Sequence, residues 1–77
     1  MKLYNVTNIK GLLDIIDNSK GRIDLIDSEG NRLNLKSKIA QYVSLAGLFK
    51  DGEIKELEIV AYEPEDTQTI LDFMMHG

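Results

Sequence analysis

The fold is decided by the stretch Leu33-Asn34-Leu35-Lys36-Ser37-Lys38-Ile39-Ala40-Gln41-Tyr42-Val43-Ser44-Leu45, whose hydrophobic period changes in the middle. Leu33 and Leu35 alternate with polar neighbours, as on a strand with one wet face. Apolar residues then recur at helical spacing, namely Ile39, Tyr42, Val43 and Ala46. Ser37 stands at the change, where the first turn of a helix needs a side-chain oxygen to accept its free amides. The stretch predicts a strand that leads directly into a helix capped by Ser37.

The rest of the chain supplies three more strands and two more helices. With the strand of the opening stretch, which extends from Arg32 to Lys36, alternating or β-favouring runs predict four strands in all; the other three lie at Lys2 to Val6, around Ile23 and Leu25, and around Leu57 to Ala61. Apolar stripes predict helices through Ile9, Leu12, Leu13 and Ile16, and through Thr67, Ile70, Leu71 and Met74. We expect all three helices to bury their stripes, with Tyr42, Phe49 and Met74 in the core.

Every predicted strand alternates, so each has one dry face and one wet face, as in an antiparallel sheet. The apolar face of that sheet is the only large partner for the three helices. The prediction is therefore an α+β fold, an open-faced two-layer sandwich in βαββαβα order. It has a four-stranded antiparallel sheet with three helices on one face, and residues 1–77 form a single domain.

The composition argues against several classes of function. There is no cysteine and only one histidine, His76, so we expect no metal site and no cofactor. The net charge is −4 and no two Lys or Arg residues are adjacent, which argues against nucleic acid and anionic membranes as partners. The least polar window, Tyr42 to Phe49, is too short to span a bilayer, and the N-terminus shows no export signal. We expect a cytoplasmic location. We also expect no enzymatic activity, because no catalytic constellation is visible.

The order of elements, with a Lys-Ser pair opening the second helix, resembles the HPr family of histidine-containing phosphocarrier proteins. The residues that carry the resemblance are Asn34-Leu35-Lys36-Ser37, Ser44-Leu45 with Gly47, and Leu57-Glu58-Ile59. The likeness covers Gly21 to the C-terminus best. It implies the fold described above and a function connected with the sugar phosphotransferase system.

The chain departs from the family at the phosphorylated histidine, which lies before the first helix in a Gly-x-His-Ala-Arg-Pro segment. Counting back from Ser37 without gaps places Val6 at the histidine position and Asn8 at the arginine position. Phosphate transfer through histidine is therefore not expected. The resemblance instead implies that Ser37 is a regulatory phosphorylation site, with Lys36 and Lys38 as neighbours of the phosphate. From its position alone, Ser37 is a helix N-cap.

Two functional hypotheses follow. The first is an HPr-like regulatory protein-interaction module that uses the side formed by the first two helices. Its interaction patch would contain Val43, Leu48 and Phe49, and its partner would be a transcription regulator, a kinase or a second copy of the chain. The alternative is a small ligand-binding or subunit-forming protein that shares only the architecture. An exposed apolar patch favours the first hypothesis, and a concave polar pocket favours the second.

Overall fold

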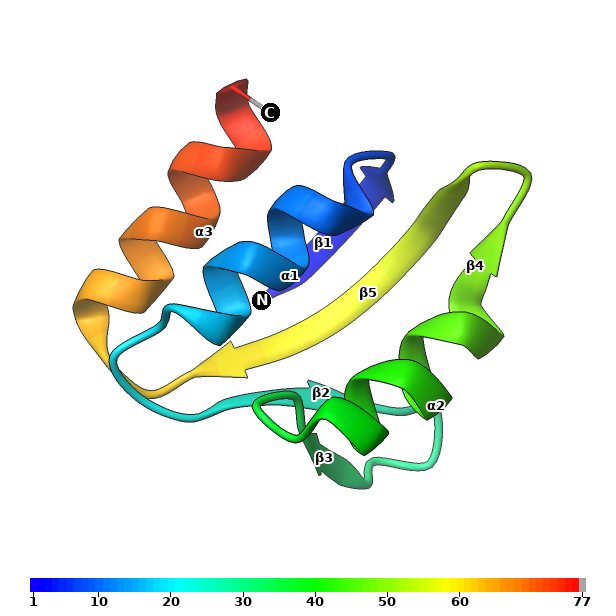
Figure 1. Ribbon diagram of the computed structural model, residues 1–77, viewed down its shortest axis with the longest axis horizontal. Helices are drawn as coiled ribbons and strands as arrows, with labels where there is room; N and C mark the ends of the chain where they lie inside the picture. Colours follow the sequence, from blue (N-terminus) through cyan, green and yellow to red (C-terminus); the bar gives the residue numbers. More distant parts are fainter. Residues whose placement is uncertain (77) are drawn as a thin grey trace.

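The computed structural model describes residues 1–76 and contains three helices and five strands (Figure 1). In chain order they are β1 (Lys2–Val6), α1 (Ile9–Asp17), β2 (Ile23–Ile26), β3 (Arg32–Asn34), α2 (Lys38–Leu48), β4 (Phe49–Lys50), β5 (Glu53–Ala61) and α3 (Pro64–His76). The predicted helices and main strands are present in the predicted order. Within the described residues, no helix combines the length and apolar character that a membrane span requires.

The strands form one open antiparallel sheet in the order β1-β5-β2-β3. The prediction of four strands was wrong, because the two-residue strand β4 also pairs with the start of β5. Asp51 and Gly52, both with positive φ, make the tight turn that brings the chain back from β4 into β5. This pairing lies outside the main order, so β4 lengthens the sheet only at one end of β5.

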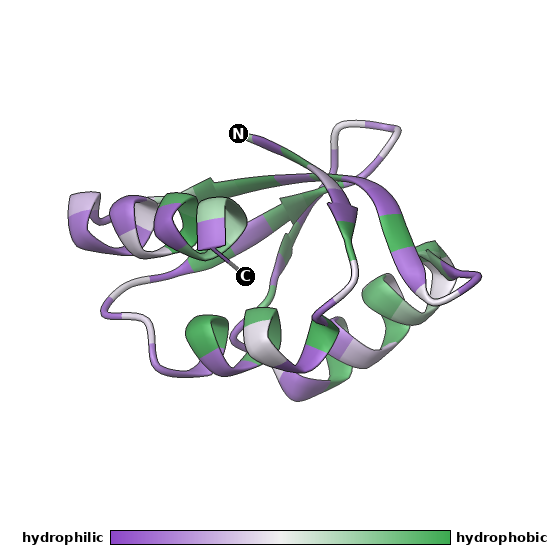
Figure 2. Ribbon diagram, turned by 90° about the horizontal axis from the view of Figure 1, so that it is seen from above, coloured by the Kyte–Doolittle hydropathy of each residue, from purple (hydrophilic) through white to green (hydrophobic). Residues whose placement is uncertain are grey.

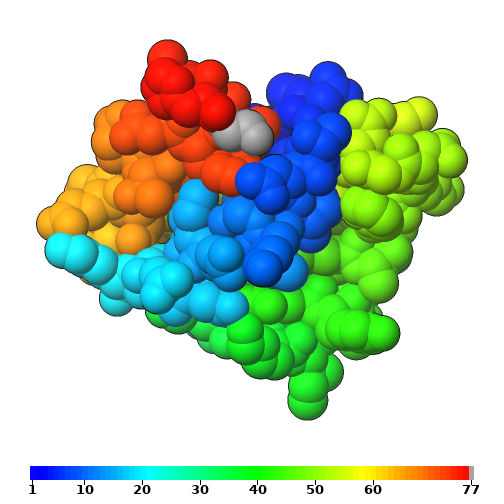
Figure 3. Space-filling model, turned by 45° about the horizontal axis from the view of Figure 1, so that its top comes forward, coloured from blue at the N-terminus to red at the C-terminus, as the bar shows by residue number. Residues whose placement is uncertain are grey.

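The three helices lie on the same face of the sheet (Figure 1), and Figure 2 shows α1 and α2 as a layer below the strands. This confirms the predicted two-layer α+β arrangement. Helix α1 lies between α3 and α2 on the helical side (Figure 3). The buried core draws on both layers and consists of Leu3, Val6, Leu12, Ile16, Ile23, Leu25, Leu35, Leu45, Ile54, Leu57, Ile59 and Ile70.

The alternation of buried and exposed residues breaks at one level of the sheet. On β1 the buried residues Leu3 and Val6 are three positions apart, and Asn5 between them has a φ of 55°. Their partners on β5, Leu57 and Ile54, are also three apart and also buried. Both strands therefore change phase together, which keeps the apolar side chains of each on the helical face.

The loop after α1 is tied to the first turn of α3. The carboxylate of Asp66 is buried and accepts the backbone N–H groups of Lys20 and Gly21, each at 2.9 Å. These two hydrogen bonds lower the pKa of Asp66. The contact joins segments more than 40 positions apart in the sequence and holds β2 in place beside β5.

The predicted strand Arg32 to Lys36 ends early, at Asn34. Leu35 lies in the turn before α2, yet its side chain is fully buried and its backbone N–H donates to the carbonyl of Ile23 at 2.8 Å. Leu35 is therefore buried in the core, as the alternation predicted, but it belongs to a turn and not to a strand.

Candidate functional site

Helix α2 presents its apolar stripe to solvent. Ile39, Tyr42 and Val43 are 78%, 81% and 69% exposed. The expectation that this stripe faces the core is therefore wrong, and so is the expectation that Tyr42 and Phe49 are core residues. Met74, in contrast, packs against the core as expected.

Polar contacts on its inner side hold α2 in this orientation. Gln41 is buried, and its amide nitrogen donates to a carboxylate oxygen of Asp17 and to the carbonyl of Leu35, each at 2.7 Å. Lys38 pairs with the same carboxylate at 2.5 Å. Hydrogen bonds from Lys38 and Gln41 lower the pKa of Asp17. Since Gln41 must face the core to make these bonds, residues about 100° to 180° away around the helix must face outward.

Leu45 is the main apolar contact of α2 with the core. The helix therefore has a narrow buried side and a second, exposed apolar side. Between Ile39 and Phe49 there is no charged residue. A helix on a protein surface normally carries charged side chains on its wet side, and a helix that is apolar on several sides is normally covered.

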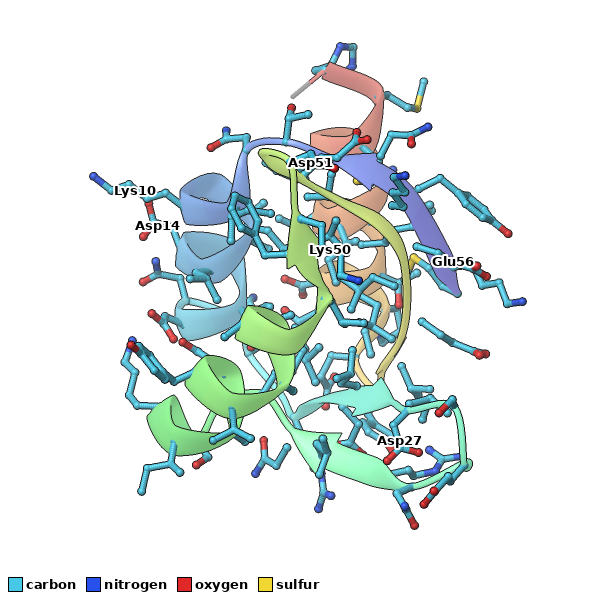
Figure 4. All side chains as sticks on the ribbon, turned by 90° about the vertical axis from the view of Figure 1, so that its right-hand side faces the viewer. Lys10, Asp14, Asp27, Lys50, Asp51 and Glu56 are labelled. Atoms are coloured by element: carbon cyan, nitrogen blue, oxygen red, sulfur yellow. The ribbon has the colours of Figure 1, made fainter. Side chains whose placement is uncertain are left out.

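An apolar groove of about 620 Å³ runs between α1 and α2. Its lining includes Ile9 and Leu13 from α1, Tyr42, Leu45 and Ala46 from α2, and Phe49 from β4. Lys10 also lines the groove. Its side chain points outward from α1, and the side chain of Asp14, one turn further on, points outward as well (Figure 4). The groove and the exposed stripe of α2 adjoin each other and together form one apolar surface. We refer to the residues Ile39, Tyr42, Val43, Ala46 and Phe49, with the adjoining groove, as the α2 face.

The three residues of the predicted patch are all exposed, but they do not lie together. Val43 is on the outer side of α2, and Phe49, 46% exposed, lines the groove toward α1. Leu48, 38% exposed, lines a different cleft, of about 520 Å³, between α2 and the sheet. The structure thus assigns Phe49 to the α2 face and separates Leu48 from it. Ile39 and Tyr42, which the sequence placed in the core, belong to the surface instead.

Ser37 is the N-cap of α2, and its hydroxyl oxygen accepts the N–H of Ala40 at 3.4 Å. The side chain is exposed. Of the two lysines beside it, Lys36 donates to the carbonyl of Ser19 at 2.8 Å, and Lys38 pairs with Asp17. Both lysines therefore connect the start of α2 to the end of α1.

The positions that the resemblance aligned with the active site of the HPr family hold structural residues. Val6 is buried in the core at the end of β1. Asn8 is the N-cap of α1, and its side-chain oxygen accepts the N–H of Gly11 at 3.0 Å. His76 lies exposed in the last turn of α3. Among residues 1–76, no group of three or more His, Cys, Asp and Glu is arranged to hold a metal ion.

A buried carboxylate on the open face of the sheet was missed by the sequence reasoning. Asp24 accepts hydrogen bonds from Arg22 at 2.5 Å and from the hydroxyl of Tyr62 at 2.7 Å, and Arg32 donates to that hydroxyl at 2.8 Å. Burial raises the pKa of Asp24, but the hydrogen bonds from Arg22 and Tyr62 outweigh this effect and lower it. In the sequence Asp24 is an ordinary polar residue on a wet face, because its partner Tyr62 is 38 positions away. Both carboxylate oxygens of Asp24 accept a hydrogen bond, and the cluster joins β2, β3 and the end of β5.

Comparisons with protein-family models, with curated proteins and with solved structures gave no match to this chain.

Proposed function

We propose that this protein is a non-catalytic protein-interaction module of the HPr-like kind, which binds its partner through the α2 face. The observation that carries the proposal is an exposed helix side with no charged residue from Ile39 to Phe49, next to an apolar groove. Exposed apolar surfaces of this kind, rimmed by polar residues, mark sites of association. The order of elements supports the HPr-like assignment, with β4 as an addition.

Phosphate transfer through histidine is not part of the proposed function. Val6 is buried where the family has its histidine, and the exposed His76 is at the C-terminal end of a helix, where the helix dipole disfavours an added negative charge. Incubation with the sugar-transport phosphorelay and labelled phosphoenolpyruvate should leave the protein unlabelled. Stoichiometric acid-labile label would contradict this part of the proposal.

Regulation at Ser37 is the second part of the proposal. A phosphate on its hydroxyl would lie at the N-terminus of α2, where the helix dipole favours negative charge, and beside Lys36 and Lys38. It would compete with Asp17 for Lys38, which links α1 to α2 at one end of the groove. Phosphorylation would thereby alter the α2 face without a residue of that face being modified.

Partner capture from a native extract tests the proposal. The immobilised wild type should retain a protein partner, which we expect to be a transcription regulator, a kinase or a second copy of this chain added to the extract. Val43→Glu, which places a charge on the α2 face, should release it. Met75→Glu is the matched control, because Met75 is 76% exposed on α3 and receives the same charge. Equal retention by all three proteins would contradict the docking role of α2. Equal retention by wild type, Ser37→Asp and kinase-treated protein would reduce Ser37 to a helix cap.

The alternative function, binding of a small molecule, is favoured by the cleft that Leu48 lines. Buried Leu25 and Leu57 form part of its wall, and Glu56 and Glu58 lie at its rim. Its volume is within the range of ligand sites. A Leu25→Trp variant that fills the cleft, tested beside the wild type in a thermal-shift screen of small cationic amphiphiles, distinguishes this function. Stabilisation of the wild type alone would favour it.

A further inference from the structure

The lack of charge on the α2 stripe limits which partner surfaces can bind to the α2 face. From Ile39 to Phe49 the chain offers no charge, and Lys10 of α1 is the charged residue that lines the adjoining groove. A charge buried against the apolar stripe of α2 would have no counter-charge on this stripe, so the partner surface that meets the stripe must also be uncharged. The chain itself carries a net charge of −4. Two copies therefore repel each other in most orientations, and the α2 face is a surface through which they can meet without placing like charges in contact.

The two ends of the α2 face carry opposite charge. At the start of α2 lie Lys36, Lys38 and Asp17, which together leave one net positive charge. At the other end, the β4–β5 turn carries Lys50, Asp51 and Glu53, which leave one net negative charge; Asp51 is at the tip of this turn (Figure 4). If two copies of the helix lie antiparallel, the positive end of each meets the negative end of the other. A parallel arrangement would place like ends together.

A two-fold arrangement also determines which parts of the α2 face meet. The ridge of this face, formed by Ile39 and Val43, runs beside the groove between α1 and α2. A two-fold axis that crosses the middle of α2 at right angles places the ridge of each copy on the ridge of the other, with Val43 on Val43, and sets the two grooves side by side. In such an interface the same patch serves both copies.

We propose that the occupant of the α2 face is a second copy of this chain, packed about a two-fold axis with the two α2 helices antiparallel. This inference rests on the proposed function, since it names the partner of the same surface. The two copies bury Ile39, Tyr42 and Val43 of each against the other.

Sedimentation equilibrium over a range of concentrations is the first test. The wild type and Met75→Glu should form dimers with similar dissociation constants. Val43→Glu should raise the dissociation constant at least about tenfold, and circular dichroism should show it folded, because Val43 is exposed and outside the core. A wild type that stays monomeric up to about 1 mM, or a Val43→Glu dimer as tight as the wild type, would overturn the proposal.

Cysteine cross-linking tests the antiparallel geometry, and the chain contains no cysteine to interfere. Val43 is the middle residue of α2, so Val43→Cys from two copies should approach and form a disulfide under mild oxidation. Ile39→Cys should not cross-link with itself, because the two copies of residue 39 would be about 12 Å apart along the helix axes. It should cross-link when mixed with Gly47→Cys, which lies opposite it and where an added side chain meets open space.

The outcomes separate this inference from the proposed function. A monomeric wild type that still retains an extract protein, lost in Val43→Glu, would overturn the second copy as occupant and leave the interaction module standing. Efficient self-cross-linking of Ile39→Cys without cross-linking to Gly47→Cys would overturn the antiparallel arrangement. A monomer that retains nothing would overturn both.

Discussion

At the scale of single residues, two buried carboxylates hold together segments that are distant in the chain. Asp24 is held by Arg22 and Tyr62, and Asp66 by the amides of Lys20 and Gly21. In each case the charged form accepts the hydrogen bonds, and the pKa is lowered. A chain of this size has a small margin of stability, so a few such links matter.

These links predict a loss of stability in acid. A carboxyl whose pKa is lower in the folded state contributes stability that is present above its unfolded pKa, near 4, and is lost as the pH falls through the folded pKa. The free energy of unfolding should therefore decrease below about pH 4. Asp66→Asn should be less stable than the wild type at pH 7, and the difference should shrink toward pH 2. Urea unfolding at several pH values measures this, and a difference that does not change with pH would contradict it.

Ser37 has a structural role whether or not it is phosphorylated. Ser37→Ala leaves the amide of Ala40 without its side-chain acceptor and should cost about 1 kcal/mol. Ser37→Asp should retain most of that stability, because aspartate also caps and its charge is favourable at a helix N-terminus. Urea unfolding of the three proteins checks this. A Ser37→Ala variant as stable as the wild type would show that the cap contributes little.

At the scale of elements, α2 departs most from the sequence prediction, because the apolar stripe that was expected in the core faces solvent. Its stripe has the same spacing as the stripe of α1, in which Leu12 and Ile16 are buried as predicted. Period alone cannot say which of two apolar sides of a helix meets the core. In α2 this is decided by Gln41, whose partners Asp17 and Leu35 come from outside the helix.

The orientation of α2 predicts a contrast between two substitutions. Leu45→Ala removes a buried side chain and should cost about 2 to 5 kcal/mol. Tyr42→Ser removes an exposed one and should change the free energy of unfolding by less than about 0.5 kcal/mol. Both should be measured by urea unfolding at low protein concentration, where association adds no stability. A large loss in Tyr42→Ser under these conditions would mean that α2 packs with the other side inward.

Other features could be predicted from the sequence only in part, for similar reasons. The helices, the order of the elements and the burial of Leu35 follow from local patterns. Strand β4 was missed because two residues carry no period, and the buried state of Asp24 was missed because Tyr62 reaches it from another strand. The Ser37 cap was visible because its acceptor and donor are three residues apart.

At the scale of the whole molecule, the two layers leave two different surfaces. The open face of the sheet carries charged pairs such as Lys2 with Glu56 and the cluster around Asp24. The helical side carries the α2 face, which has no charged residue from Ile39 to Phe49. The polar surface suits contact with water, and the apolar surface suits association.

The docking role of α2 is tested most directly by the chain's three tyrosines, which are all exposed: Tyr4 at 54%, Tyr42 at 81% and Tyr62 at 50%. Only Tyr42 lies on the α2 face. Nitration rates of each tyrosine should be compared between the dilute purified protein and the same protein in native extract or at high concentration. We predict that Tyr42 becomes protected while Tyr4 and Tyr62 keep their rates. Nitration of Tyr42 at the same rate under all conditions, or protection of Tyr4 and Tyr62 instead, would contradict a docking surface on α2.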